Sequence, residues 1–370
     1  MLGNYQSEQD ILTGWNMDQI TLPQPGPVAL FGSGETAPGG QKIFDFLFRL
    51  LQKSPQVSII ETPAGFELNA EQVAGNVGDF IKHRLQNFKP HIQLIPARKK
   101  GTQFSPDDPE IALPILKSDL IFMGPGSPSY AVRQLEDSLT WEYILARHRL
   151  GAALAFSSAT TVAISSSALP VYEIYKVGED PHWKNGLDFF SPYGLSLVFV
   201  PHWNNKDGGD GLDTSRCYMG ASRFQDLKDR LPKDQVVIGI DENTGLVIDF
   251  QSACFHVVGQ SNVTILREGA EQVIPSGSGI DLLELGDFNL CDPLAGISQS
   301  SWDQAHLIQS ELKTGPRIPP QVIVLAEKRA KARQSKDWDT ADQLRQAVEE
   351  LGWVIQDNPD GFIIENKTDQ

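Results

Sequence analysis

The chain has 370 residues, of which 40% are hydrophobic and 21% are charged, and this ordinary globular composition argues against a disordered, collagen-like or disulfide-stapled protein. Lysine and arginine number 31 against 47 aspartates and glutamates, which gives a formal net charge of −16. Because a negative field repels phosphate backbones and anionic lipid, nucleic-acid binding would require a local basic patch, and no membrane partner is expected.

The N-terminus and the cysteines bear on where the protein works. Residues 1–26 are interpreted as an N-terminal extension, and residues 1–19 contain no lysine, arginine or apolar run, so neither a signal peptide nor a transit peptide is expected. No segment approaches the roughly 20 apolar residues of a membrane span. Cys217, Cys254 and Cys291 are widely spaced and match no zinc or redox pattern, which favours a reduced, cytoplasmic location.

From residue 27 to about 223, short apolar runs alternate with helical periodicity, as in 42–53 and 68–88. Six apolar runs are predicted to be buried strands: 28–31, 57–61, 92–95, 119–123, 152–156 and 197–200. This alternation predicts an α/β fold, with a mostly parallel sheet covered by helices on both faces. The active site of such a sheet belongs at the carboxyl ends of its strands.

The sequence after this region has a more β-like pattern. Residues 236–250 are interpreted as two strands about a turn near 243–245, and 254–285 continues in short β-like pieces that suit an antiparallel finish. We therefore assign one domain to residues 27–285. The polar passage 286–317, which contains proline and serine, is predicted to be a linker.

The strongest chemical signal lies at the end of the fifth predicted strand, where Ser157 and Ser158 precede a helical stretch. A serine at a sharp strand-to-helix turn holds its hydroxyl above the sheet, and the next backbone N–H can stabilise an oxyanion. Either serine could be the nucleophile. The alternative is that they only cap the helix.

A general base and an orienting carboxylate can also be found at predicted strand ends. His202 directly follows the strand 197–200 and could take the serine proton, whereas His182 lies in a loop. Asp241 and Glu242 follow another strand-like run, and only one of them can face the site because consecutive strand residues point to opposite faces. The alternative roles are a solvated turn and an imidazole bonded to water.

Two glycine-rich segments, 32–35 and 124–128, follow the first and fourth predicted strands. Glycine lets backbone N–H groups approach negative charge. The sequence lacks a Gly-x-Gly-x-x-Gly dinucleotide fingerprint, a phosphate-loop motif and metal-ligand spacing. We therefore expect no cofactor and no metal.

Taken in chain order, these segments resemble the serine-hydrolase branch of the class I glutamine amidotransferase-like fold, the group that contains cyanophycinase and dipeptidase E. The resemblance covers about residues 27–258, and its most specific segment is Gly-Ile-Asp-Glu at 239–242. It implies a serine hydrolase that cleaves a peptide or amide bond beside an acidic, aspartyl residue through an acyl-enzyme. The expected substrate is a peptide or an amino-acid derivative.

The resemblance also implies a role for individual residues. Ser158 would be the nucleophile, His202 the base and Glu242 the acid that orients it. The amides of Gly126 and Ala159 would form the oxyanion hole.

Two substitutions in the turn leave alternatives open. Phe156 and Thr160 stand where the family has small residues, so Ser157 remains a second candidate nucleophile and an inactive protein of the same fold remains an alternative. Arg216 and Lys176 could bind a substrate carboxylate, or they could form ordinary surface salt bridges.

The C-terminal segment, 318–370, is predicted to be a separate helical hairpin. Its first helix breaks around residues 336–338, the second ends at Gly352, and a β-like tail follows over 353–364. The pattern around 332–345 resembles the small C-terminal domain of cysteinyl-tRNA synthetase. The chain lacks the His-x-Gly-His and Lys-Met-Ser-Lys-Ser motifs of the synthetase itself.

The charge of this hairpin does not distinguish between the kinds of partner that it could bind. Residues 318–370 contain 7 basic and 10 acidic side chains, although 328–336 form a local basic stripe. RNA contact, protein docking and homodimerisation are the alternatives. The rival to the hydrolase is therefore a catalytically inactive scaffold module whose hairpin recruits a protein or RNA partner.

Overall fold

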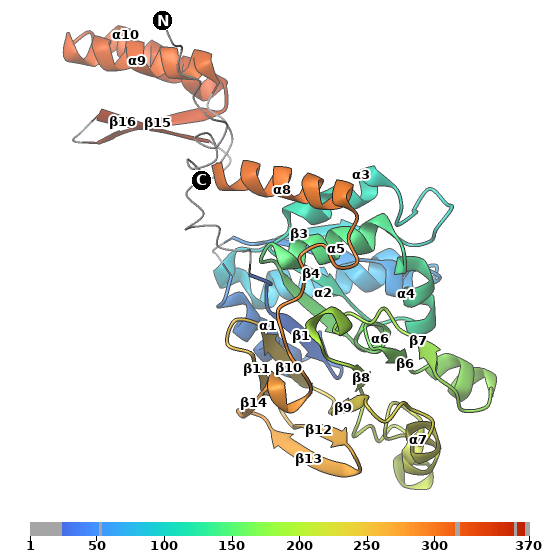
Figure 1. Cartoon of the computed structure of the whole chain (residues 1–370). Coiled ribbons are helices and arrows are strands. Elements are labelled where there is room, and N and C mark those ends of the chain that lie inside the picture. Colours follow the sequence, from blue (N-terminus) through green and yellow to red (C-terminus); the bar gives the residue numbers. More distant parts are fainter. Residues whose placement is uncertain (1–23, 52–53, 315–318, 359–360, 367–370) are drawn as a thin grey trace, which may run out of the picture. The chain divides into compact units, whose positions relative to one another are not determined.

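The computed structural model describes four ranges of the chain: 24–51, 54–314, 319–358 and 361–366 (Figure 1). Most of the predicted N-terminal extension, residues 1–23, lies outside them. The chain divides into two compact units, of which the first ends at His306 and the second begins at Leu307.

The larger sheet of the first unit has eight strands. In chain order they are β1 (Val28–Phe31), β2 (Gln56–Ile60), β3 (His91–Ile95), β4 (Leu120–Met123), β5 (Ala153–Ser157), β10 (Thr244–Asp249), β11 (Cys254–Gly259) and β14 (Gly279–Asp281). Their order in the sheet is β14-β11-β10-β1-β5-β4-β2-β3. Strands β1 to β5 are parallel and the other three are antiparallel, which confirms the predicted fold class. Each parallel strand lies within one residue of its predicted bounds.

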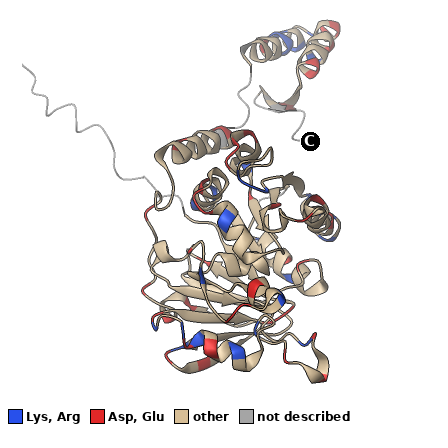
Figure 2. Ribbon diagram, turned by 90° about the vertical axis from the view of Figure 1, so that its right-hand side faces the viewer, with Lys and Arg blue, Asp and Glu red and all other residues tan. Residues whose placement is uncertain are grey.

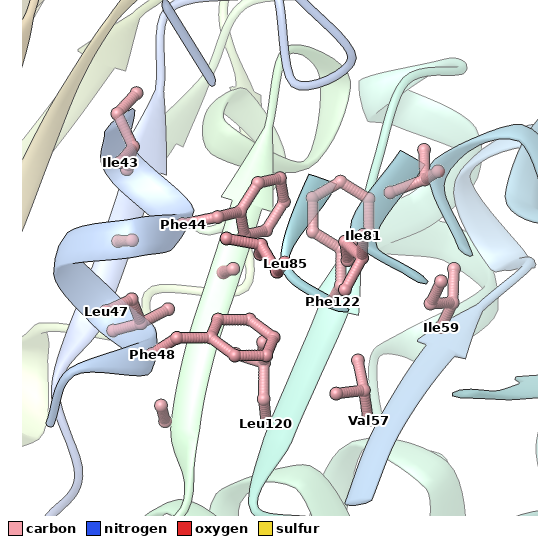
Figure 3. Packing of buried hydrophobic residues seen from close by; sticks show 14 of the residues in the cluster. Ile43, Phe44, Leu47, Phe48, Val57, Ile59, Ile81, Leu85, Leu120 and Phe122 are labelled. Atoms are coloured by element: carbon pink, nitrogen blue, oxygen red, sulfur yellow. The ribbon is translucent and has the colours of Figure 1, made fainter. Parts of the chain in front are cut away.

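Helices cover both faces of this sheet. Helices α1 (Pro38–Phe48) and α2 (Ala70–Arg84) cover one face, where Phe44 of α1 packs on Phe122 of β4 with ring centroids 5.8 Å apart (Figure 3). The other face carries α4 (Pro128–Leu135), α5 (Leu139–Arg149) and α6 (Ala159–Ala163). There Phe156 packs on Phe189, which contacts His148 of α5. Each large apolar side chain buried in this way contributes roughly 1.5–3 kcal/mol.

Helix α1 begins four residues before the predicted helix 42–53 and ends at Phe48. Its first turn contains Gly39 and Gly40, which directly follow Pro38. In the structure both glycines are buried, and a Cβ at Gly39 would crowd the carbonyl oxygen of Asn243. The glycines therefore permit close packing inside a helix instead of forming a turn.

The first unit also contains a second, separate sheet of four strands. Its strands are β8 (Leu197–Val200), β9 (Val236–Ile240), β12 (Asn262–Arg267) and β13 (Ala270–Pro275), in the order β13-β12-β9-β8. The expectation that 197–200 joins the main sheet was therefore wrong. The two strands within 236–250 also do not pair with each other, since β9 pairs with β8 and β12 whereas β10 pairs with β1 and β11.

The two sheets meet where four strands end. The amide of Gly32 donates to the carbonyl oxygen of Thr244 at 2.9 Å, and the carbonyl oxygen of Gly32 accepts from the amide of His202 at 3.0 Å. Trp203 donates to the carbonyl oxygen of Ile240 at 3.1 Å. The amide of Ser158, directly after β5, donates to the carbonyl oxygen of Phe31 at 3.4 Å. Together these backbone hydrogen bonds join the carboxyl ends of β1, β5, β8 and β9.

The predicted linker 286–317 contains a helix, α8 (Gln299–Thr314), and its last three residues lie outside the described ranges. Ser298 begins this helix, because its hydroxyl accepts from the amide of Ser301 at 3.3 Å. Ser301, Ala305 and Ile308 are buried at helical spacing. The passage looked like a linker because polar residues separate these three positions.

The second unit has the predicted hairpin. Its elements are α9 (Pro320–Gln334), α10 (Trp338–Glu350), β15 (Trp353–Asn358) and β16 (Gly361–Asn366). The break falls at the predicted place, with Lys336 at φ 61°, and Gly352 at φ 82° ends the second helix. Val322, Val348 and Trp353 form part of a small core of this unit. Among the described residues, no helix is long and apolar enough to cross a membrane.

Candidate active site

Ser158 lies at the turn between β5 and α6 with φ 51° and ψ −107°. A residue with a side chain rarely adopts such a conformation, and it carries the hydroxyl out of the strand direction. Thr161 Oγ1 lies 3.0 Å from the carbonyl oxygen of Phe31, and Thr160 Oγ1 donates to the carbonyl oxygen of Gly124 at 2.9 Å. These two hydroxyls tie the turn to the ends of β1 and β4, so the β-branched Thr160 is accommodated.

The two adjacent serines have different surroundings. Ser157 is fully buried and its hydroxyl donates to Glu35 Oε2 at 2.7 Å. Ser158 is partly exposed, and its Oγ lies 3.0 Å from Nε2 of His202. The structure thus brings Ser158, and not Ser157, to the imidazole.

His202 and Glu242 complete a line of hydrogen bonds. His202 Nδ1 lies 2.8 Å from Glu242 Oε1, and their side chains are 16% and 29% exposed. The hydrogen bond from His202 is the main cause that holds the pKa of Glu242 below its usual value, and a second bond from Asn205 adds to it. The carboxylate is therefore ionised at neutral pH and can stabilise an imidazolium.

Asp241, the other member of the acidic pair, faces away from the histidine. Its carboxylate accepts from the hydroxyl of Ser261 at 2.6 Å and from the amide of Asn262 at 3.1 Å. Of the two acids that the sequence left open, Glu242 is the one beside His202.

A pocket of about 380 Å³ opens beside Ser158. Its wall combines apolar and aromatic side chains with polar groups, and it includes Gly126 and Ala159, the two residues expected to form the oxyanion hole. Gly126 has φ 149°, and a Cβ at this position would overlap with the carbonyl of Pro63. Only glycine therefore lets this segment lie so close to its neighbour. The other lining residues are Pro128, Val162, Val171, Tyr172, Tyr175, Lys176, Asp207, Cys217, Tyr218 and the pair Ser158 and His202.

The two cations expected to bind substrate are placed differently. Lys176 lines the pocket. Arg216 does not, because its guanidinium lies 3.9 Å from the ring centroid of Trp203 and donates to the Trp203 carbonyl at 3.1 Å. His182 also lies elsewhere, with Nδ1 2.9 Å from the carbonyl oxygen of Asp180.

Several residues around the site were given no role from the sequence. Asn205 donates to Glu242, and Asp207 accepts from the hydroxyl of Tyr218 at 3.0 Å. The Tyr218 ring lies 5.6 Å from that of His202. Asn205 and Asp207 could have been suspected because they closely follow His202, whereas Tyr218 could be placed only through its segment, 213–220, which was expected to flank the site.

The cysteine beside the pocket is poorly suited to act as a nucleophile. Burial raises the pKa of Cys217, which lines the pocket, to about 12, so its thiol is protonated at neutral pH. Within the described ranges, no three histidine, cysteine, aspartate or glutamate side chains are grouped so that they could hold a metal ion.

Basic residues lie on the helices of the second unit, where Figure 2 marks them in blue. Part of this basic stripe is used in contacts within the unit. Arg329 is 3% exposed and makes two hydrogen bonds to the carboxylate of Asp357, at 2.8 and 2.9 Å. Lys328 and Lys331 are exposed on the same helix. The surface charge of α9 is therefore smaller than its sequence suggests.

The C-terminal segment matches one family of known proteins, and the fold of the chain is similar to that of another protein. Residues 315–362 match the family model of the cysteinyl-tRNA ligase anticodon binding domain, which confirms the resemblance seen in the sequence. Cysteine–tRNA ligase from Methanosarcina mazei is 40% identical over 47 residues, 13% of this chain and 10% of the ligase. That from Pelotomaculum thermopropionicum is 31% identical over 127 residues, 33% of this chain and 25% of the ligase. The chain thus spans a tenth to a quarter of the length of these relatives.

The fold is similar to that of a solved peptidase. The crystal structure of a peptidase from an acI-B1 actinobacterium superposes with a TM-score of 0.56 at 23% identity, covering 70% of this chain and 98% of that one. The likeness is one of fold, and it confirms the predicted peptidase-like architecture.

Proposed function

We propose that this protein is a serine hydrolase that cleaves a peptide or amide bond through an acyl-enzyme at Ser158. The observation that carries the proposal is the line of hydrogen bonds from Ser158 Oγ to His202 Nε2 at 3.0 Å and from His202 Nδ1 to Glu242 Oε1 at 2.8 Å. This is the order of groups that activates a hydroxyl nucleophile. The strained turn and the adjoining pocket support it.

The reaction follows from the positions of these atoms. Ser158 Oγ attacks the carbonyl carbon while His202 Nε2 takes the hydroxyl proton, and Glu242 stabilises the imidazolium that forms. The tetrahedral intermediate collapses when the C–N bond breaks and His202 returns the proton to the leaving amine. Water, deprotonated by the same imidazole, then attacks the acyl carbon. The C–O bond to Ser158 breaks as His202 returns the proton to Ser158 Oγ, which releases the acid and frees the serine.

The negative oxygen of the tetrahedral intermediate needs fixed donors. The amides of Gly126 and Ala159 are proposed for this role because both residues line the pocket beside Ser158, and Ala159 is the first residue of α6. Losing one such donor typically costs 100- to 1,000-fold in rate.

The substrate is proposed to carry an acidic, aspartyl residue beside the scissile bond. Lys176 supports this preference, since it is the cation among the residues that line the pocket. Changing Lys176 to methionine should then raise KM for an acidic peptide while leaving that for its neutral amide analogue unchanged. Equal effects on both peptides would remove the preference from the proposal.

The proposal is tested with a panel of dipeptides and the variants Ser158→Ala and Ser157→Ala. The first variant should lose hydrolysis by at least about 1,000-fold, because it lacks the attacking oxygen. The second should remain active, since the hydroxyl of Ser157 is directed to Glu35. If both variants lose hydrolysis equally, or if Ser158→Ala still hydrolyses the dipeptides, Ser158 is not identified as the nucleophile. A folded wild type without activity towards any amide would favour the inactive scaffold.

We also propose that the C-terminal unit contacts RNA. Its match to an anticodon binding domain and the exposed Lys328 and Lys331 support this. Binding of a tRNA transcript, followed by fluorescence anisotropy, should weaken with salt and weaken further when both lysines are changed to glutamine. Lys233→Gln on the first unit is the control. If the affinity for tRNA is the same with and without the two lysine changes in α9, protein docking or a homodimer would be favoured as the role of this unit.

A further inference from the structure

Asn205 is a buried polar residue directly behind the candidate acid. It is 2% exposed, although asparagine is usually a surface residue. Its Nδ2 donates to Glu242 Oε1 at 2.8 Å, and its Oδ1 accepts from the amide of Asp207 at 3.1 Å. Both ends of the amide are therefore occupied, which fixes its orientation.

The carboxylate of Glu242 is held by more than the histidine. A single oxygen, Oε1, receives hydrogen bonds from His202 Nδ1 and from Asn205 Nδ2, both at 2.8 Å. The backbone amide of Glu242 donates to the side chain of Asn204 at 2.9 Å. A glutamate on a turn has three rotatable side-chain bonds, so His202 alone would leave its carboxylate free to turn.

The same loop continues into the pocket wall. Asp207 accepts from the hydroxyl of Tyr218, and the Tyr218 ring lies 5.6 Å from that of His202. Asp207 and Tyr218 both line the pocket. Asn205 thus joins the carboxylate to the wall that a substrate would touch.

We propose that Asn205 is a positioning residue that locks the Glu242 carboxylate against His202 and so keeps the imidazole aimed at Ser158. The inference rests on the proposed function, because the aim of the imidazole matters only if His202 takes the proton. Asn205 itself touches neither the nucleophile nor the pocket. A misplacement of about 1 Å at a reacting group can lower a rate about 100-fold.

The test is the inactivation of the full chain by a fluorophosphonate, which needs no knowledge of the substrate. Asn205→Ala should lower the maximal inactivation rate, kinact, about 10- to 100-fold and leave the probe's half-saturation concentration, KI, within about twofold. Asn289→Ala, the same change at an exposed asparagine of the first unit, is the matched control and should react as the wild type does.

A second variant, Asn205→Asp, keeps the shape of the side chain and gives a readout that a purely structural role would not move. Next to Glu242 the new carboxylate cannot donate while ionised, and it can donate once the pair takes up a proton. The rate of this variant relative to the wild type should therefore rise as the pH falls from 9 to 5.

The outcomes separate the two proposals. If Ser158→Ala still reacts with the probe, the proposed function fails. If Ser158→Ala is inert but Asn205→Ala reacts at the wild-type kinact, or the Asn205→Asp ratio is flat with pH, only the role of Asn205 fails.

Discussion

Ser158 and His202 share an unusual backbone angle, since each has φ 51°. Such residues typically cost about 1–3 kcal/mol and persist only where neighbouring bonds hold them. Here the amide of His202 is held by the carbonyl of Gly32, and the turn after Ser158 is held by the hydroxyl of Thr161. The conformation places the hydroxyl and the imidazole 3.0 Å apart before any substrate arrives.

Gly126 gives a prediction about the oxyanion donors. Gly126→Ala should destabilise the first unit by several kcal/mol or displace the loop, because a Cβ would overlap with the carbonyl of Pro63 at a φ that favours glycine. The Gly126→Ala variant should also react more slowly than the wild type with a fluorophosphonate. Gly75→Ala is the control, since a Cβ in the middle of α2 has room and should stabilise the helix by about 0.5–1 kcal/mol. Equal chemical-denaturation midpoints for the two variants would contradict this account.

Glu242 gives a prediction about pH. Its pKa is lowered in the folded state, so the unfolded chain binds more protons near its ordinary value of 4.5 and folding is favoured as the pH rises through that range. The stabilisation is fully present above about pH 5.5 and is lost as the pH falls through the folded pKa. The difference in unfolding free energy between wild type and Glu242→Gln should therefore shrink on acidification. A constant difference from pH 6 to 3 would show that the bond to His202 does not lower this pKa.

At the scale of elements, Arg329 links α9 to β15 through Asp357. Arg329→Ala should leave the carboxylate without its main partner and lower the protection of β15 amides against hydrogen exchange by about 2 kcal/mol. Arg345→Ala removes an exposed pair with Glu349 on one helix and should cost about 0.3–0.5 kcal/mol. If both variants exchange alike, the Arg329 pair is only a surface contact.

Continuous apolar runs and helix-ending residues predicted the positions of strands and helix ends well. The buried runs that became β1 to β5 and the hairpin break near Lys336 were located to within a residue or two. Pairing between distant strands leaves no local pattern, so the separate sheet of β8 and β9 was missed. Glycine has no side chain that could mark the buried face of a helix, so the first turn of α1, which contains Gly39 and Gly40, was not predicted.

The candidate site shows the same division. Strand ends located His202, the two adjacent serines and the two adjacent acids, but the pattern alone left the choice within each pair open. The structure places Ser158 and Glu242 beside His202. The direction of a long side chain depends on its backbone and neighbours. Arg216 has φ 58°, and its guanidinium stacks on Trp203. Neither feature is visible in the sequence, so the sequence could not show that this side chain is directed to Trp203.

The whole molecule combines two units with separate hydrophobic cores. The first unit has clusters around Phe122 and around Val198, and the second has its own around Val348. Val348→Ala should destabilise the second unit by about 2 kcal/mol, because the side chain is fully buried. The reaction of Ser158 with a fluorophosphonate should stay at the wild-type rate. A parallel loss of reactivity would show that the two units depend on each other for folding.

In the proposed reaction one hydroxyl, that of Ser158, is activated by His202. The most direct measurement is to treat the folded wild-type protein with a fluorophosphonate, digest it, and locate the phosphonyl group by mass spectrometry. We expect one adduct per chain, on Ser158, and none in His202→Ala. An adduct on Ser157 or on another residue, or no adduct on a folded protein, would contradict it.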